Sequence, residues 1–204
     1  MTTDDTDKPG LGLFTIPNAV TVVRLACLPV FLYLLFGLDD RGAAAWLLAA
    51  IGVTDWLDGY LARRLHQVST VGKVLDPTAD RLVFLVAAVA LLIDGSVPAW
   101  FGIATLVREG FVAIVALLLA MAGARRIDVT YVGKLATLGL MLAFPLFLAG
   151  ASDLFFHRPA RVVAWLIGVP SLVLSYYAAA KYAPLARDAL SRRHTPKAPS
   201  RDPV

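Results

Sequence analysis

The chain has 204 residues, of which 58% are hydrophobic and 17% are charged, and its mean hydropathy is +0.71. A soluble domain is about 45–50% apolar and about 25% charged, so this composition excludes an intrinsically disordered chain and a collagen-like fibre. The single cysteine, Cys27, excludes a disulfide-stabilised scaffold. A membrane-spanning helix needs about 20 mostly apolar residues, and the apolar content is sufficient for about six such helices.

The polar residues 1–14 are expected to form an N-terminal tail, because they lack the basic start and apolar middle of a signal peptide. Apolar segments then follow at residues 17–38, 43–65, 75–93, 98–123, 129–149 and 161–183. We therefore predict an all-α integral membrane protein with six transmembrane helices in a bundle, its membrane domain covering residues 15–184. Pro184 is expected to end the last helix, and the basic, proline-rich residues 185–204 are expected to be a disordered tail.

The distribution of lysine and arginine predicts the orientation of these helices. An even number of spans places both termini on one side, and 13 of the 19 basic residues fall on that side. The other side carries only Arg41, Arg158 and Arg161. Because cytoplasmic loops carry an excess of Lys and Arg, both termini are expected in the cytoplasm, in a multi-pass protein of the plasma membrane. The basic tail is either solvated or in contact with anionic membrane lipids, and nucleic-acid binding is not expected because no aromatic platform accompanies the basic residues.

Four carboxylates fall at the end of the second apolar segment and the start of the third: Asp55, Asp58, Asp76 and Asp80. The spacings of three and four residues place each pair on one helix face. Four carboxylates that converge in a low dielectric repel one another strongly, unless they are protonated or bind cations. Hard oxygen ligands favour Mg²⁺ or Mn²⁺, and two such ions would leave room for a phosphate-bearing substrate.

Two other classes of protein share parts of this pattern. In a structural membrane protein, the carboxylates would form salt bridges, Asp76 or Asp80 with Arg81 and the earlier pair with Arg63. In a small cation transporter, they would form a transport site, but such proteins are typically built from inverted repeats or discontinuous helices. The chain has no internal repeat, and a transport site gives no role to the small residues Gly59 and Ala62 on the acidic face.

The motif around these carboxylates resembles the signature of the CDP-alcohol phosphatidyltransferases. Its fixed positions are Asp55, Asp58, Gly59, Ala62, Arg63, Gly72, Asp76 and Asp80, with every spacing of the family kept. The resemblance extends from Pro17-Asn18 through the last apolar segment. It implies a six-helix membrane bundle, a homodimer, and an active site that faces the cytoplasm. It also implies an enzyme that transfers the phosphatidyl group of CDP-diacylglycerol to an acceptor hydroxyl and releases CMP.

The resemblance also implies a role for each motif residue. Asp55, Asp58 and Asp76 correspond to the ligands of one Mg²⁺ (or Mn²⁺) ion, and Asp55, Asp76 and Asp80 to those of a second. Asp80 also corresponds to the catalytic general base. The residues that would bind CDP-diacylglycerol are Asn18, Thr21, Gly59, Arg63, Ser69 and Gly72. Asn18 and Thr21 belong to an Asn-x2-Thr-x2-Arg pattern that ends at Arg24, and they also fit a helix N-cap and a back-bonded helix residue.

Two later segments bear on which alcohol accepts the phosphatidyl group. Arg108, followed by Glu109, is either half of a buried ion pair or an acceptor contact, and Lys134 is either a cytoplasmic anchor or a phosphate ligand. Family members that use glycerol-3-phosphate usually carry Gly-Lys-x-Lys-Thr here, whereas this chain has Ala136 in place of the second lysine. The segment is more similar to actinobacterial cardiolipin synthases, which implies phosphatidylglycerol as acceptor. The alternative is glycerol-3-phosphate, as in a phosphatidylglycerophosphate synthase.

Overall fold

The computed structural model describes the backbone of residues 16–65, 72–121 and 131–193, and the side chains of residues 20–54, 78–117, 121 and 131–181. These residues form six α-helices and one π-helical turn and contain no strand, which confirms the all-α prediction for the described part of the chain. The elements are α1 (Ile16–Leu32), η1 (Tyr33–Gly37), α2 (Arg41–Leu65), α3 (Gly72–Asp94), α4 (Ala99–Met121), α5 (Tyr131–Gly150) and α6 (His157–Arg193).

Local sequence explains where these helices begin and end. Asp40 caps α2, because its side-chain Oδ1 accepts a 2.8 Å hydrogen bond from the backbone N–H of Ala43. The preceding residue, Asp39, has a φ of +52°, a left-handed conformation that short polar side chains tolerate. At the next reversal, Gly95 has a φ of +78° and follows directly after α3. The third apolar segment therefore ends where the sequence predicts.

Helix α6 is longer than the sequence predicts. Pro184 was expected to end it, but α6 runs for 37 residues and continues to Arg193. An interior proline removes one backbone donor and crowds the preceding turn, which typically kinks or breaks a helix. Here the helix continues, and the residues after Pro184 are mostly good helix formers. The first part of the predicted disordered tail is therefore helical.

Four helical segments of the described chain are long and apolar enough to cross a membrane: Val20–Gly37, Ala99–Leu117, Tyr131–Gly150 and His157–Lys181. In α2, whose side chains are described as far as Thr54, the stretch Arg41–Thr54 is apolar. The motif carboxylates occupy the rest of α2 and the start of α3, and they lower the hydropathy of those two helices. The described residues thus support a multi-pass membrane protein through four candidate spans.

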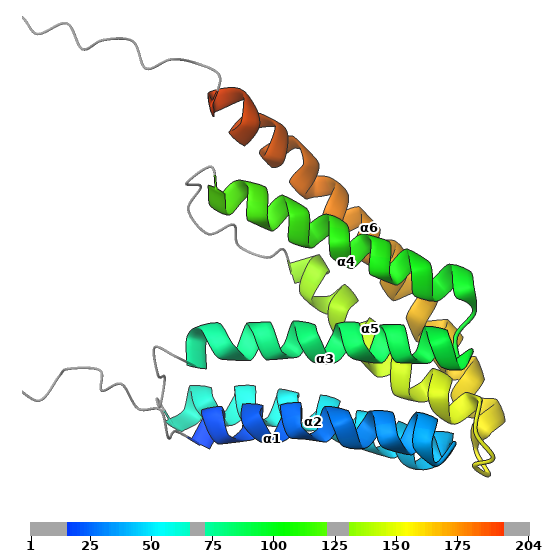
Figure 1. The fold of residues 1–204 in the computed structure, drawn as a ribbon. Helices are drawn as coiled ribbons and strands as arrows, with labels where there is room; N and C mark the ends of the chain where they lie inside the picture. The colour runs from blue at the N-terminus through cyan, green and yellow to red at the C-terminus, as the bar shows by residue number, and fades with distance from the viewer. Residues whose placement is uncertain (1–15, 66–71, 122–130, 194–204) are drawn as a thin grey trace, which may run out of the picture.

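The helices form a bundle in which α1, α2 and α3 run side by side and α4, α5 and α6 cross them obliquely (Figure 1). α1 packs against both α2 and α3, while α5 packs most extensively against α6 and also contacts α2 and α3. α4 completes the bundle through contacts with α3 and α6. The first and last described residues, Ile16 and Arg193, lie toward the same end of the bundle.

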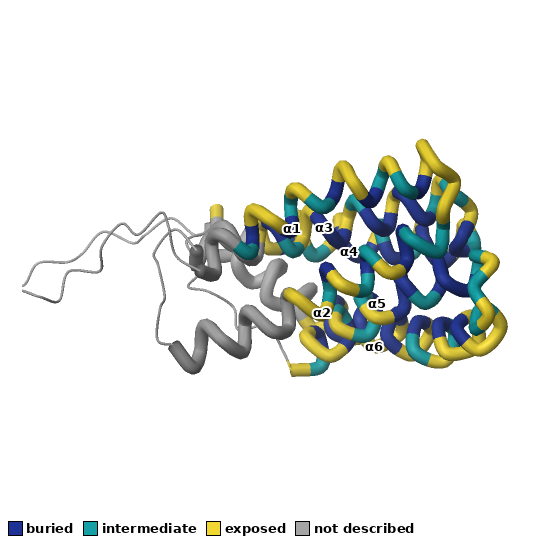
Figure 2. Tube along the Cα trace, turned by 90° about the horizontal axis from the view of Figure 1, so that it is seen from below, coloured by how far each residue is buried: buried dark blue, intermediate teal, exposed yellow. Residues whose placement is uncertain are grey.

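Small residues and aromatic rings share the core, which lies on the inward faces of the helices (Figure 2). Close helix contacts through small residues are typical of membrane bundles. A Cβ atom added at Gly139 of α5 would lie 1.9 Å from Ser171 Oγ of α6, so these helices approach closely there. Phe101, Phe147 and Trp165 then join α4, α5 and α6, with ring centroids 5.0 to 5.9 Å apart.

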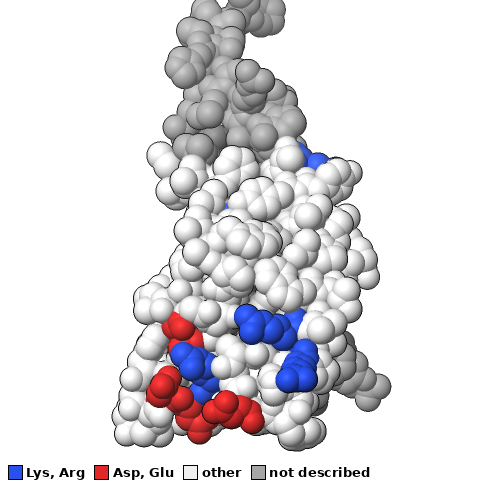
Figure 3. All heavy atoms as spheres, turned by 90° about the vertical axis from the view of Figure 1, so that its right-hand side faces the viewer, with Lys and Arg blue, Asp and Glu red and all other residues white. Residues whose placement is uncertain are grey.

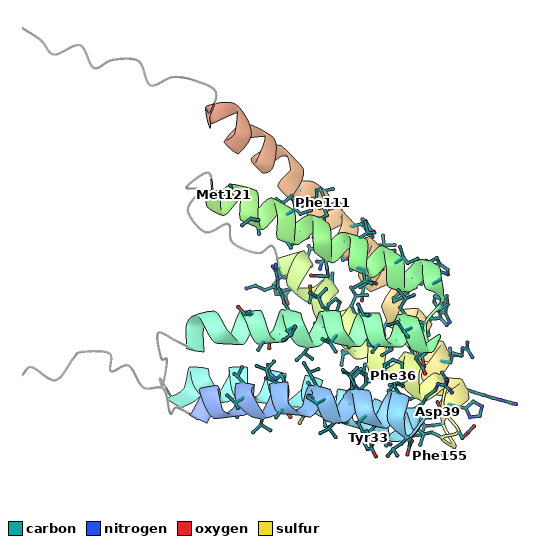
Figure 4. All side chains as sticks on the ribbon, viewed as in Figure 1. Tyr33, Phe36, Asp39, Phe111, Met121 and Phe155 are labelled. Atoms are coloured by element: carbon teal, nitrogen blue, oxygen red, sulfur yellow. The ribbon has the colours of Figure 1, made fainter. Side chains whose placement is uncertain are left out.

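Charged and aromatic side chains gather at the end of the bundle away from Ile16 and Arg193. Figure 3 looks onto this end, where acidic and basic groups lie together. Arg41 Nε donates a 3.0 Å hydrogen bond to Oδ2 of the buried Asp94, and this bond raises the pKa of Arg41 above its ordinary value. Tyr33 and Phe155 are exposed at the same end (Figure 4). Aromatic residues at this level are typical of a membrane–water interface.

Candidate active site

The predicted site lies at the end of the bundle where α1 begins, α2 ends and α3 begins (Figure 1). A small apolar cluster of Leu28, Ile51 and Val83 joins these three helices. Each of these residues is three or four positions, about one turn, from a motif residue on its own helix: Arg24, Asp55 and Asp80 respectively. The cluster therefore fixes the motif-bearing turns of the three helices relative to one another.

Arg24 of α1 and Asp80 of α3 form an ion pair across this site. Arg24 Nη1 donates a hydrogen bond to Asp80 Oδ1. The Arg24 side chain is 3% exposed and the Asp80 side chain is 34% exposed, so the cation is buried while the carboxylate stays partly accessible. The sequence suggested Arg81 as a partner for Asp80, but Arg81 is exposed and the structure pairs Asp80 with a residue 56 positions away.

The other motif carboxylates are placed by their helices. Asp55 and Asp58 lie three residues apart in the last part of α2, and Asp76 lies one turn before Asp80 in α3. Their side chains are outside the part of the chain whose side chains the structure describes. No group of three or more metal-ligating side chains is found among the described residues, and Asp80 is the one motif carboxylate in that set.

The donor chemistry fits a divalent metal. The motif supplies four carboxylates from two helices, and hard carboxylate oxygens suit Mg²⁺ or Mn²⁺. Asp80 is accessible enough to bind a ligand, whereas a purely structural intramembrane carboxylate is typically buried against its partner. Asp80 is therefore the described residue that best fits both a metal ligand and a proton acceptor.

Thr21 shares the face of α1 that carries Arg24. It is 1% exposed and lies one turn before Arg24, so this face of α1 points into the bundle. Asn18 lies one turn earlier in the same helix, and its side chain is outside the described set, as are Arg63 and the glycines at 59 and 72. Ser69 lies outside the described residues. Of the residues expected to bind nucleotide, only Thr21 has a described side chain.

Arg108 and Glu109 form a buried pair in α4. Arg108 Nη1 donates a hydrogen bond to Glu109 Oε1, and the two residues are 6% and 8% exposed. Within the described residues, Arg108 Nε is buried and has no hydrogen-bond partner. The pair thus satisfies part of the guanidinium and leaves one buried donor for a further ligand.

The two acceptor positions on α5 differ in their surroundings. Ala136 is fully buried, on the same side of α5 as the buried Gly133 and Leu140. Lys134 is exposed, and its position is about 200° around the helix from Ala136. The position that lacks the second lysine of the glycerol-3-phosphate transferases therefore faces the interior of the bundle.

Sequence reasoning missed the partner of Asp80. The signal was present, because Arg24 is a charged residue inside an apolar segment, and such residues need a partner or a function. Its partner was not predictable from spacing, because α1 and α3 are brought together only by the fold. In the structure, α1 packs against both α2 and α3.

The family model for CDP-alcohol phosphatidyltransferases matches residues 14–177 of the chain. A Streptomyces coelicolor protein named cardiolipin synthase (CMP-forming) is 37% identical over 175 residues, which is 83% of this chain and 81% of that protein. A Bacillus subtilis protein named CDP-diacylglycerol–glycerol-3-phosphate 3-phosphatidyltransferase is 33% identical over 146 residues, covering 64% of this chain and 75% of that protein. A Haemophilus influenzae protein of the same name is 35% identical over 136 residues, covering 64% and 73%.

Proposed function

The chain belongs to the CDP-alcohol phosphatidyltransferase family, and we propose that it transfers the phosphatidyl group of CDP-diacylglycerol to phosphatidylglycerol, forming cardiolipin and CMP. The family match establishes the class of enzyme. The identity of the acceptor alcohol is the part that we propose. The observation that supports phosphatidylglycerol as the acceptor is the fully buried Ala136, which stands where glycerol-3-phosphate transferases typically have a lysine.

The charge of the two acceptors explains why Ala136 matters. Glycerol-3-phosphate presents a phosphomonoester dianion, whereas phosphatidylglycerol presents a phosphodiester with a single negative charge. An inward-facing lysine at position 136 would stabilise the dianion, and the methyl group of Ala136 cannot. Arg108, whose buried Nε–H has no partner in the described chain, would donate a hydrogen bond to a phosphodiester. Lys134, exposed near the start of α5, is the second candidate for an acceptor contact.

The aspartates of the motif would hold two divalent ions, which we take to be Mg²⁺ or Mn²⁺. Asp55, Asp58 and Asp76 would bind one ion, and Asp55, Asp76 and Asp80 would bind the other. When bound, such ions supply positive charge to the diphosphate of the substrate. Asn18, Thr21, Gly59, Arg63, Ser69 and Gly72 would contact CDP-diacylglycerol.

The reaction requires a group that accepts a proton, and we assign this role to Asp80. Its partly exposed carboxylate would take the proton of the acceptor hydroxyl, and the resulting oxygen attacks the β-phosphorus of CDP-diacylglycerol. The bond from that phosphorus to the bridging oxygen then breaks, and CMP leaves with the bond's electron pair. Arg24 is close enough to hold the Asp80 carboxylate in place.

The protein is a multi-pass membrane protein, with four apolar helices in its described part. We propose that α2 and α3 also cross the membrane, which gives six spans and puts both termini in the cytoplasm of a plasma-membrane protein. The excess of basic residues on the terminal side supports this orientation. The site at the start of α1 then opens to the cytoplasm, and we expect the enzyme to act as a homodimer.

The acceptor is tested by offering the purified full-length protein CDP-diacylglycerol and Mg²⁺ with either phosphatidylglycerol or glycerol-3-phosphate. Mass spectrometry of the extracted lipids identifies the product. We expect cardiolipin and CMP with phosphatidylglycerol. Phosphatidylglycerophosphate as the only product would support the alternative acceptor, and no CMP with either alcohol would contradict the proposed reaction.

A further inference from the structure

The buried guanidinium of Arg24 has a specific relation to the carboxylate of Asp80. A buried charge is costly unless it is paired. The ion pair with Asp80 is one interaction that offsets this cost. Asp80 is the less buried partner. The cation therefore lies inside the bundle, and the carboxylate that it contacts lies at the site.

The same carboxylate is the proposed ligand of a divalent ion, so the inference rests on the proposed function. A guanidinium hydrogen-bonded to Oδ1 occupies one lone pair of that oxygen and makes the oxygen less available to a metal. It also places a positive charge within a few ångströms of the expected ion, where like charges repel. Arg24 and a metal at Asp80 therefore compete for one carboxylate.

Arg24, which competes with the metal for Asp80, lies on the face of α1 that is expected to contact the substrate. Thr21 lies one turn before Arg24 and is fully buried, and Asn18 lies one turn before Thr21. Arg24 therefore lies on the same helix face as the residues that are expected to contact CDP-diacylglycerol, and a movement of its side chain would change the surroundings of those residues. The apolar contacts of Leu28 with Ile51 and Val83 hold the next turn of α1 in place.

We propose that Arg24 is a positioning residue that holds the Asp80 carboxylate and weakens the binding of a divalent ion to it. It keeps the general base oriented before the metal binds, and it links metal binding at α3 to the nucleotide face of α1. Removing Arg24 should therefore increase metal affinity while lowering turnover. If Arg24 had only a structural role, its removal would lower the metal affinity, because a less ordered site binds metal more weakly.

The test is a titration of purified full-length protein with Mn²⁺, followed by electron paramagnetic resonance in the absence of substrate. We expect Arg24→Gln to bind the Asp80-dependent Mn²⁺ about tenfold more tightly than the unmodified protein. Its kcat should fall about tenfold at saturating Mn²⁺. Arg24→Lys should keep metal affinity near the original, because it keeps the charge. Arg81→Gln, which removes an exposed cation from the same turn of α3, should change neither quantity.

Mn²⁺ binding that is unchanged by Asp80→Asn would overturn the metal role of Asp80 and this inference with it. Binding that depends on Asp80 but is unchanged or weaker in Arg24→Gln would overturn the inference alone. Arg24→Met keeps the apolar stem of the side chain and replaces the glutamine variant if that variant does not fold.

Discussion

Lys134 and Ala136 lie two residues apart on α5 but face different surroundings, since Lys134 is exposed and Ala136 is 0% exposed. The buried side of α5 continues through Leu140 and Phe144 into the core. Position 136 is therefore an interior position near the start of α5. A cation placed there would face the interior of the bundle, whereas Lys134 reaches the interior only by bending its side chain around the helix.

Ala136→Lys should shift the acceptor preference toward glycerol-3-phosphate. We expect the ratio of kcat/KM for glycerol-3-phosphate to kcat/KM for phosphatidylglycerol to rise about tenfold, because the new cation stabilises a dianion more than a monoanion. Ala136→Met adds similar length without charge and serves as the control. An equal shift in both variants would show that volume, rather than charge, sets the preference.

Gly139→Ala should destabilise the contact between α5 and α6. The added Cβ would lie 1.9 Å from Oγ and 2.9 Å from Cβ of Ser171, so the helices must separate. We expect a loss of about 1–3 kcal/mol in the free energy of unfolding, measured as a lower thermal midpoint in detergent. At Gly52 of α2, an added Cβ meets nothing within 4 Å, so Gly52→Ala should leave the midpoint unchanged or raise it. Equal losses in the two variants would mean that helix separation is not the cause.

Arg41→Gln should destabilise the opposite end of the bundle. It leaves Asp94, whose side chain is 5% exposed, with the hydrogen bond from Ser96 Oγ but without its cation. We expect a loss of about 2 kcal/mol, reduced by the partial exposure of Arg41. Arg158→Gln removes an exposed arginine at the same end and is the matched control. Similar thermal midpoints for the two variants would indicate that the ion pair adds little to stability.

The sequence was sufficient to predict the helices, because long apolar segments and a few polar breaks carry that information locally. Asp40 at the start of α2 and Gly95 after α3 are examples in which a single residue determines a helix end. The end of α6 was not predictable in this way. Proline at 184 is tolerated there, since the sequence around it favours the helix on both sides.

The sequence was sufficient to predict which residues form the site, but not which of them form an ion pair. The spacing of Asp76 and Asp80 gives a common helix face, and the structure places both on α3. The pairing of Asp80 with Arg24 depends on how α1 packs against α3, and no local pattern encodes that contact. The interior position of Ala136 likewise became evident only once α5 had a defined buried face.

Glu109→Gln should separate the two roles considered for Arg108. It leaves the buried guanidinium beside a neutral amide, and we expect a loss of about 3 kcal/mol in the free energy of unfolding. The double variant Arg108→Gln with Glu109→Gln should recover part of this loss, because it removes the buried charge. The KM for phosphatidylglycerol should rise in the double variant and stay near the original in Glu109→Gln. A KM that rises equally in both would contradict a contact between Arg108 and the acceptor.

We expect the motif aspartates to carry a metal-dependent phosphatidyl transfer, which is measured as CMP release from CDP-diacylglycerol. With phosphatidylglycerol and Mg²⁺ present, Asp76→Asn and Asp80→Asn should lower CMP release at least about 100-fold, while remaining folded by thermal unfolding. Asp153→Asn, at an exposed position at the far end of the bundle, should release CMP at the original rate. Chelation by EDTA should abolish release by the unmodified protein, and added Mg²⁺ should restore it. CMP release at the original rate by folded Asp76→Asn or Asp80→Asn would show that these aspartates do not carry the transfer.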